Sequence, residues 1–172
     1  MNERAVFVLA GLAGAFALLH GRAVAAGDVY GADQVRALAA PAAGRFDFPT
    51  VDMLTAIAFV ESSFNPAAYR YEPHLGDASV GLMQTLTSTA RWLYEDMGYR
   101  DHGEPTLESL ARSPQQSLYF GAAYLDWLSR WKGRRRSEEW IIRAYNGGPG
   151  GATSAATAPY WSKYQAARRR FG

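Results

Sequence analysis

The amino-acid sequence predicts a mainly helical fold, in the form of a single compact domain. Apolar residues recur every three or four positions through most of the chain after residue 50, which is the period of an amphipathic helix. Caps, prolines and glycines separate these stretches. No stretch shows sustained strand alternation, and no internal repeat is present. The chain of 172 residues has room for one domain with short additions.

Residues 1–25 have the three-part layout of a secretory signal peptide. A short polar start precedes an apolar and glycine-rich run from Ala5 to Leu19, and residues 23–25 form a small-x-small cleavage pattern. The apolar run is shorter than the ~18–20 residues that cross a bilayer. We therefore expect export to the periplasm or the medium, with no stable membrane span after cleavage. An uncleaved N-terminal anchor is the alternative.

Residues 26–49 form a predicted lead-in segment, rich in alanine and glycine, with one short helix around residues 33–39. The main domain is predicted over residues 50–172. Thr50 can cap its first helix, which should end before the next Asn-Pro pair. A long polar loop is expected over residues 65–80.

Start and stop signals predict four further helices. The first covers about residues 86–97 and stops at a glycine. The second opens at a capping box with Pro114 at the first helical position, and stops near Gly133. The third follows a serine and two glutamates, which suit the positive end of a helix dipole, and stops at the Asn-Gly-Gly-Pro of residues 146–149. The last begins at Pro159.

Composition excludes several classes of function. The chain has no cysteine, so it forms no disulfide, thiolate metal site, cysteine nucleophile or lipid-linked cysteine. A net charge of +2 provides no broad field for a nucleic-acid partner. His74 and His102 lack the spacing of a metal pair, and the glycine-rich residues 147–151 lack the lysine of a nucleotide site. We therefore expect neither a metal nor a cofactor.

Glu61 is the residue whose chemistry stands out. It follows Leu54, Ile57 and Ala58 at helical spacing, so it continues their apolar face at the last turn of the predicted helix. Burial and the negative end of the helix dipole both raise the pKa of a carboxyl group. A carboxyl group that stays protonated near neutral pH can act as a general acid. The alternatives are a glutamate that swings into solvent or one that pairs with an arginine.

Three short motifs resemble those of lytic transglycosylases and goose-type lysozymes. They are ESSFNP at residues 61–66, GLMQ at residues 81–84 and AYNGG at residues 144–148, in the order found in that family. The resemblance extends over roughly residues 51–168 and implies an α+β lysozyme-like fold with a substrate cleft. It further implies cleavage of the β-1,4 bond between N-acetylmuramic acid and N-acetylglucosamine in peptidoglycan, with formation of 1,6-anhydromuramic acid.

The same resemblance implies roles for individual residues. Glu61 matches the family's single acid and base, for which the nucleophile is the muramic 6-hydroxyl of the substrate. Seven further residues match substrate-binding positions: Ser63, Gly81, Met83, Gln84, Tyr145, Asn146 and Tyr160. For Met83, Tyr145 and Tyr160 a place in the core is the alternative, and for Gln84 it is a role in capping the next helix.

Two acidic residues keep a hydrolytic reaction open. Glu72 and Asp77 lie between the first two motifs, and either could activate water on the far face of the sugar, as in an inverting glycosidase. Leu86 occupies the place where goose-type lysozymes carry an acid, which favours the transglycosylase reaction. A catalytically inactive scaffold that binds peptidoglycan is a further alternative, and the retained Glu61 argues against it because an ionised carboxylate on an apolar face is costly.

Glycan strands of peptidoglycan are the expected partner. A small exported member of this family would suit local opening of the cell wall for a secretion apparatus, a pilus or a phage. The sequence does not distinguish among these three.

Overall fold

Seven α-helices and a small sheet make up residues 29–172, the part of the chain that the computed structural model describes. The helices are α1 (Ala32–Arg45), α2 (Val51–Ser62), α3 (Thr87–Glu95), α4 (Leu107–Arg112), α5 (Pro114–Ser129), α6 (Glu138–Gly151) and α7 (Ala158–Phe171). The strands are β1 (Tyr69–Glu72), β2 (Asp77–Val80) and β3 (Thr85–Leu86). The mainly helical prediction is confirmed. The signal peptide predicted over residues 1–25 lies outside the described residues.

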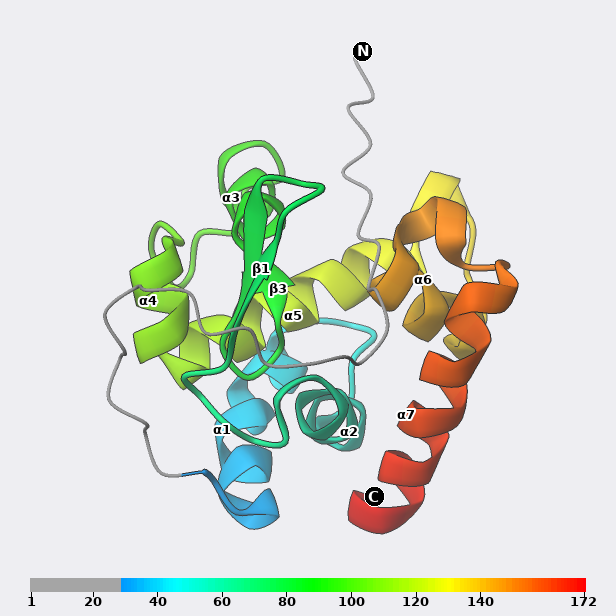
Figure 1. Ribbon diagram of the computed structural model, residues 1–172, viewed down its shortest axis with the longest axis horizontal. Coiled ribbons are helices and arrows are strands. Elements are labelled where there is room, and N and C mark those ends of the chain that lie inside the picture. Colours follow the sequence, from blue (N-terminus) through cyan, green and yellow to red (C-terminus); the bar gives the residue numbers. More distant parts are fainter. Residues whose placement is uncertain (1–28) are drawn as a thin grey trace.

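Helix α5 is the central element of the fold. It contacts α1, α3, α4 and α6, and it is buried along almost its whole length. A helix that is enclosed in this way needs apolar or small residues on every side, as the Leu-Tyr-Phe-Gly-Ala-Ala-Tyr-Leu of residues 118–125 provides. Figure 1 shows α5 crossing the middle of the molecule, with α1, α2 and α7 below it and the strands with α3 above it.

Helix α2 begins and ends as predicted. The Thr50 hydroxyl caps its first turn by accepting a backbone hydrogen bond at 3.2 Å. After its last residue, Ser63 and Phe64 adopt left-handed conformations with φ of 50° and 66°. This turn directs Phe64 into the core, where its ring centroid lies 5.4 Å from that of Phe59 and 5.2 Å from that of Phe171. The C-terminal ends of α2 and α7 are thereby joined.

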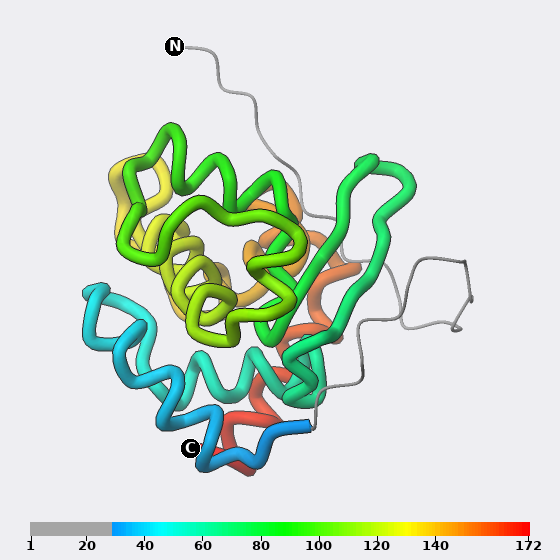
Figure 2. Tube along the Cα trace, turned by 90° about the vertical axis from the view of Figure 1, so that its left-hand side faces the viewer, coloured from blue at the N-terminus to red at the C-terminus, as the bar shows by residue number. Residues whose placement is uncertain are grey.

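The prediction of a long loop over residues 65–80 is wrong, because this segment forms a β-hairpin. Strands β1 and β2 pair antiparallel, with Tyr71 opposite Ala78, and β3 pairs with β2. Figure 2 shows the hairpin extending away from the helices. Each hairpin strand has four residues, β1 is mostly exposed and β2 is mostly buried. Neither strand therefore has the alternating pattern that identifies a half-buried strand.

Asp77 ties the hairpin to helix α3. Its Oδ1 accepts a hydrogen bond from the Ala78 N–H at 2.7 Å, and its Oδ2 accepts one from the Ser88 N–H at 3.0 Å. Because Ser88 lies in the first turn of α3, the carboxylate is placed at the positive end of that helix dipole. Thr87 strengthens the junction by donating to the Ala78 carbonyl oxygen at 3.3 Å.

Three helices differ from the sequence-based prediction. Helix α1 extends well beyond the short helix expected at residues 33–39, and it packs against α2 and α5. The sequence does not predict α4, because six residues are too few to display a period, although Thr106 and Ser109 form a capping box. Helix α6 continues past its expected stop after a break at Gly148, where φ is 69°. No helix within residues 29–172 has the length and hydropathy needed to cross a bilayer.

We predict that Gly81→Ala lowers the free energy of unfolding by about 2–4 kcal/mol. Gly81 has φ of 77°, and an added Cβ would lie 2.6 Å from the Leu110 carbonyl oxygen and 2.7 Å from Ser117 Oγ. Left-handed strain and overpacking each cost about 1–3 kcal/mol. Urea unfolding followed by circular dichroism measures the loss.

Gly76→Ala is the matched control for this substitution. Gly76 also has a positive φ, 61°, but no atom lies within 4 Å of an added Cβ. This variant should lose only the strain of about 1–2 kcal/mol. Equal losses for the two variants would contradict the view that close contact, beyond backbone conformation, requires glycine at residue 81.

Candidate active site

Glu61 lies in the last turn of α2 and is held by a tyrosine from α7. The Tyr160 hydroxyl donates a hydrogen bond to Glu61 Oε1 at 2.6 Å. Tyr160 is only 8% exposed and belongs to the hydrophobic core, so it both packs the fold and contacts the carboxyl group. The two residues are 99 positions apart in the sequence. Their contact therefore depends on the packing of α7 against α2.

The surroundings of Glu61 favour its protonated form. Burial raises the pKa of Glu61 to about 7, and the negative charge of Glu72 adds to the increase. The hydrogen bond from Tyr160 and the positive charges of Arg70 and Lys163 lower this pKa and so limit the shift. Both forms of Glu61 are therefore populated at neutral pH, so the group can donate a proton and then accept one. The raised pKa expected from the apolar face of this helix is confirmed.

Tyr145, from α6, holds the turn that contains the GLMQ motif. Its hydroxyl donates to the Met83 carbonyl oxygen at 2.8 Å, and Thr85 Oγ1 lies 3.4 Å from the same hydroxyl. Burial raises the pKa of Tyr145 far above its usual range, and the negative charge of Glu61 adds to this effect. The phenol therefore stays protonated as a donor to the turn, within electrostatic reach of the candidate acid.

Gln84 closes the same turn in a left-handed conformation with φ of 47°. Such a conformation is uncommon for a residue with a long side chain, and strained residues of this kind cluster at functional sites. The Gln84 Nε2 donates to the carbonyl oxygens of Ala68 and Gly81, each at 3.0 Å. Gly81, Met83, Gln84 and Tyr145 are thus joined in one hydrogen-bonded turn.

The remaining predicted substrate-binding residues differ in exposure. Met83 is completely buried among core residues. Asn146 is 8% exposed on α6, next to Tyr145. Ser63 is exposed at the C-terminal end of α2, two residues after Glu61. Within residues 29–172, no three or more His, Cys, Asp or Glu side chains gather in a way that could hold a metal ion.

The hairpin carries a buried carboxylate that an arginine neutralises. Glu72 is only 7% exposed, and its Oε1 lies 2.5 Å from Arg70 Nε and 3.5 Å from the donor Ser79 Oγ. Arg70 and Glu72 are two residues apart on β1, so their side chains point to the same face of the hairpin. The charges of both residues act on the pKa of Glu61: Arg70 lowers it and Glu72 raises it.

Sequence reasoning missed Arg70 and Lys163, the two cations whose positive charges lower the pKa of Glu61. The spacing of Arg70 and Glu72 was a signal, since residues two apart share a face of a strand. Composition also singled out Lys163, because it is one of only two lysines among 18 lysine and arginine residues. It follows Tyr160 by three positions on α7, so the two side chains lie on the same side of that helix.

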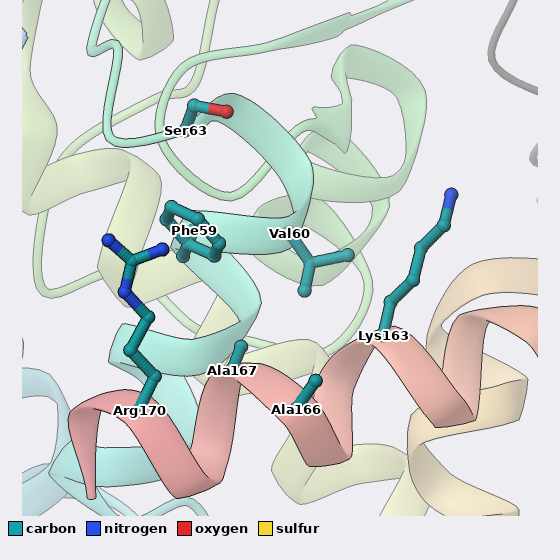
Figure 3. Close-up of a pocket in the computed structure, with 7 residues that line it drawn as sticks. All are labelled: Phe59, Val60, Ser63, Lys163, Ala166, Ala167 and Arg170. Carbon is teal, nitrogen blue, oxygen red and sulfur yellow. The ribbon is translucent and has the colours of Figure 1, made fainter.

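A groove of about 370 Å³ runs between α2 and α7. We call it the α2–α7 groove. Figure 3 shows Lys163 at one end of it and Arg170 at the other. Val60 lines it and precedes Glu61 in the sequence, but neither Glu61 nor Tyr160 belongs to its lining. Its lining consists of Phe59, Val60, Ser63, Lys163, Ala166, Ala167 and Arg170.

Comparisons with known proteins identify the family and the fold. The family model described as the Transglycosylase SLT domain matches residues 30–167. The 70-kDa soluble lytic transglycosylase in complex with bulgecin A has a TM-score of 0.54 and 20% identity, over 77% of this chain and 21% of that protein. An inactive mutant of the lytic transglycosylase Slt from Pseudomonas aeruginosa has a TM-score of 0.54 and 21% identity, over 79% and 22% of the two chains. A comparison with curated proteins finds no match.

The chain spans about a fifth of the length of these two solved proteins. At this level of identity they establish a common fold, and the expected lysozyme-like architecture is confirmed. The family model covers nearly all of the described residues. The chain therefore belongs to the Transglycosylase SLT domain family.

Proposed function

We propose that the protein is a peptidoglycan lytic transglycosylase that cleaves the β-1,4 bond between N-acetylmuramic acid and N-acetylglucosamine. The observation that carries the proposal is the single carboxyl group of Glu61, which has a pKa of about 7 and accepts a hydrogen bond from Tyr160. One such group suffices when the nucleophile belongs to the substrate, whereas glycosidases that use water need two carboxyl groups. Membership of the Transglycosylase SLT domain family supports the same substrate class.

Glu61 acts twice in the proposed reaction. In its protonated form it donates a proton to the glycosidic oxygen, so the bond from muramic C1 to that oxygen breaks and N-acetylglucosamine leaves with a free 4-hydroxyl. The resulting carboxylate takes the proton of the muramic 6-hydroxyl while O6 bonds to C1 and closes the 1,6-anhydro ring. Glu61 ends protonated, and no water is consumed. A pKa near the working pH is best suited to a group with both duties.

The turn held by Tyr145 is the proposed sugar-binding wall of the site. Gln84 uses its amide N–H groups on backbone carbonyls, which leaves its Oε1 to accept a hydrogen bond from a sugar hydroxyl or an N-acetyl N–H. Ser63, exposed beside Glu61, can bond to the sugar directly. Asn146 follows Tyr145 on α6, and the buried Met83 is part of the turn itself.

Two features disfavour the hydrolytic alternative. A carboxylate that activates water in an inverting glycosidase must be free to hold that water. Glu72 is buried against Arg70, and Asp77 accepts hydrogen bonds from two backbone N–H groups. The inactive-scaffold alternative is disfavoured by Glu61 itself, because a partly desolvated carboxyl group is costly to keep without a use.

We further propose that the protein acts on the cell wall outside the cytoplasm, after export directed by residues 1–25. The support is the polar start, apolar run and small-residue cleavage pattern of that segment. A catalytic unit of this size suits local opening of the wall for a secretion apparatus, a pilus or a phage.

We predict that Glu61→Gln abolishes release of 1,6-anhydromuropeptides, with a loss of at least about 10²–10⁴-fold. The amide neither donates the required proton nor takes one back. Mass spectrometry of digested peptidoglycan measures release, and circular dichroism checks that the variant folds. Reducing ends in the wild-type digest would contradict the transglycosylase reaction in favour of hydrolysis. Activity in Glu61→Gln would contradict the assignment of the acid.

Tyr160→Phe should raise the pKa of Glu61 above its value of about 7, because the hydrogen bond from Tyr160 lowers that pKa. The reaction needs protonated Glu61 in the free enzyme, so the basic limb of the kcat/KM–pH profile should move to higher pH. Tyr164→Phe is the matched control on the same helix, since the Tyr164 hydroxyl donates to Glu138 at 2.5 Å instead. A basic limb that stays in place in Tyr160→Phe would show that this hydrogen bond does not tune the acid.

Glu72→Gln should have the opposite effect on the pH profile. The negative charge of Glu72 raises the pKa of Glu61, so its removal lowers that pKa and moves the basic limb of kcat/KM to lower pH. The products should still be 1,6-anhydromuropeptides, because Glu72 has no chemical step in the proposed reaction. Loss of most activity at every pH, with Glu61 still essential, would instead support a hydrolase in which Glu72 is the second carboxylate.

A further inference from the structure

The loop between α5 and α6 carries four positive charges within five residues. They belong to Lys132, Arg134, Arg135 and Arg136. The first three side chains are exposed and the last is half-buried. Within residues 29–172, none of the four lies within ion-pair distance of a carboxylate. We call residues 131–136 the basic loop, and its charges are available to an anionic partner.

Backbone hydrogen bonds and tight turns fix the conformation of the basic loop. Lys132 and Gly133 adopt left-handed conformations with φ of 56° and 66°. The Arg136 N–H donates to the Ser129 carbonyl oxygen at 3.1 Å, and the Arg136 Nε donates to the Trp131 carbonyl oxygen at 3.2 Å. A loop that is ordered before it meets its partner loses little conformational entropy on binding.

Tryptophan side chains pack against the cations of the basic loop. The Lys132 Nζ lies 5.8 Å from the Trp131 ring centroid, and the Arg136 guanidinium carbon lies 4.6 Å from that of Trp140. Trp131 also packs edge-to-face against Trp127, with ring centroids 4.7 Å apart. All three indoles are half-buried. The surface of the basic loop therefore combines cations with large amphipathic rings.

The indole N–H groups of these three tryptophans reach the surface. Within residues 29–172, none of them donates to a protein acceptor, and none is buried without a partner. A stacking site for a sugar or a nucleobase needs an open ring face, but one cation lies over Trp131 and another over Trp140. A ring with an apolar body and a polar edge at the surface is instead typical of the interface of a lipid bilayer.

We propose that the basic loop binds the surface of a bilayer that contains anionic phospholipids. Lys132 and the three arginines contact lipid phosphates, and the indole edges of Trp131 and Trp140 lie at the level of the headgroups. Each cation close to an anionic leaflet increases the affinity about fivefold. The inference goes beyond the proposed function, because it gives the protein a second binding surface, separate from the reaction at Glu61.

The test titrates the full chain with two kinds of vesicle, phosphatidylcholine alone and equal parts of phosphatidylcholine and phosphatidylglycerol. The phosphatidylcholine is brominated, so it quenches the fluorescence of tryptophans that reach the bilayer. Two triple variants each remove three exposed cations, one set from the basic loop and the other from outside it. They are Lys132→Gln/Arg134→Gln/Arg135→Gln and, as the matched control, Arg112→Gln/Arg169→Gln/Arg170→Gln. Circular dichroism checks that both variants fold.

We expect the wild type and the control to be quenched on the anionic vesicles, and the loop variant to need about 100-fold more lipid for the same quenching. High salt should weaken the binding, because it screens the charges. Release of muropeptides from isolated peptidoglycan should be equal in the three proteins, which separates this test from that of the proposed function.

Two results would overturn the proposal. One is a loop variant that is quenched as strongly as the wild type, and the other is a wild type that is quenched no more on anionic than on neutral vesicles. Binding to inorganic polyphosphate without such quenching would indicate a soluble polyanion instead of a bilayer. The comparison also decides if the apolar run of residues 5–19 attaches every chain to both vesicles, because only the wild type and the control should then be quenched more on the anionic ones.

Discussion

One half-buried hydrogen bond, from the Tyr160 hydroxyl to the Glu61 carboxyl group, is the interaction around which this site is built. It joins the end of α2 to the beginning of α7, so it requires both helices to be in place. The left-handed turn at Ser63 and Phe64 ends α2 at that point and anchors it to Phe171. Burial favours the protonated form of the carboxyl group, and the tyrosine provides the polar partner that a desolvated acid needs.

The groups around Glu61 have opposing effects on its pKa. Their balance keeps both the protonated and the ionised form of the carboxyl group populated near neutral pH. Burial and Glu72 favour the protonated form, whereas Tyr160, Arg70 and Lys163 favour the ionised form. The hairpin therefore takes part in the chemistry by carrying the paired Arg70 and Glu72, although neither touches the acid. Lys163 belongs both to this balance and to the α2–α7 groove.

Much of the fold could be predicted because its signals are local. Thr50 caps α2 by bonding to its own first turn, and Ser113 and Ser137 cap α5 and α6 in the same way, so the chain near each residue contains the information. The hairpin was missed because its register depends on packing against α3 and α4 rather than on alternation along the strands. Asp77, expected in a loop as a possible second acid, instead bonds to the backbone at the start of α3.

The sequence by itself determined most of the helices, the family and the position of Glu61 on an apolar face, because spacing of three and four residues reports directly which side of a helix is buried. Only the tertiary structure decided which groups meet that carboxyl group. Tyr160, Arg70 and Lys163 come from other elements, and a spacing rule does not reach across such separations. Likewise, Tyr145 proved to hold the Met83 turn, since a buried phenol bonds to whichever acceptor the packing brings within reach.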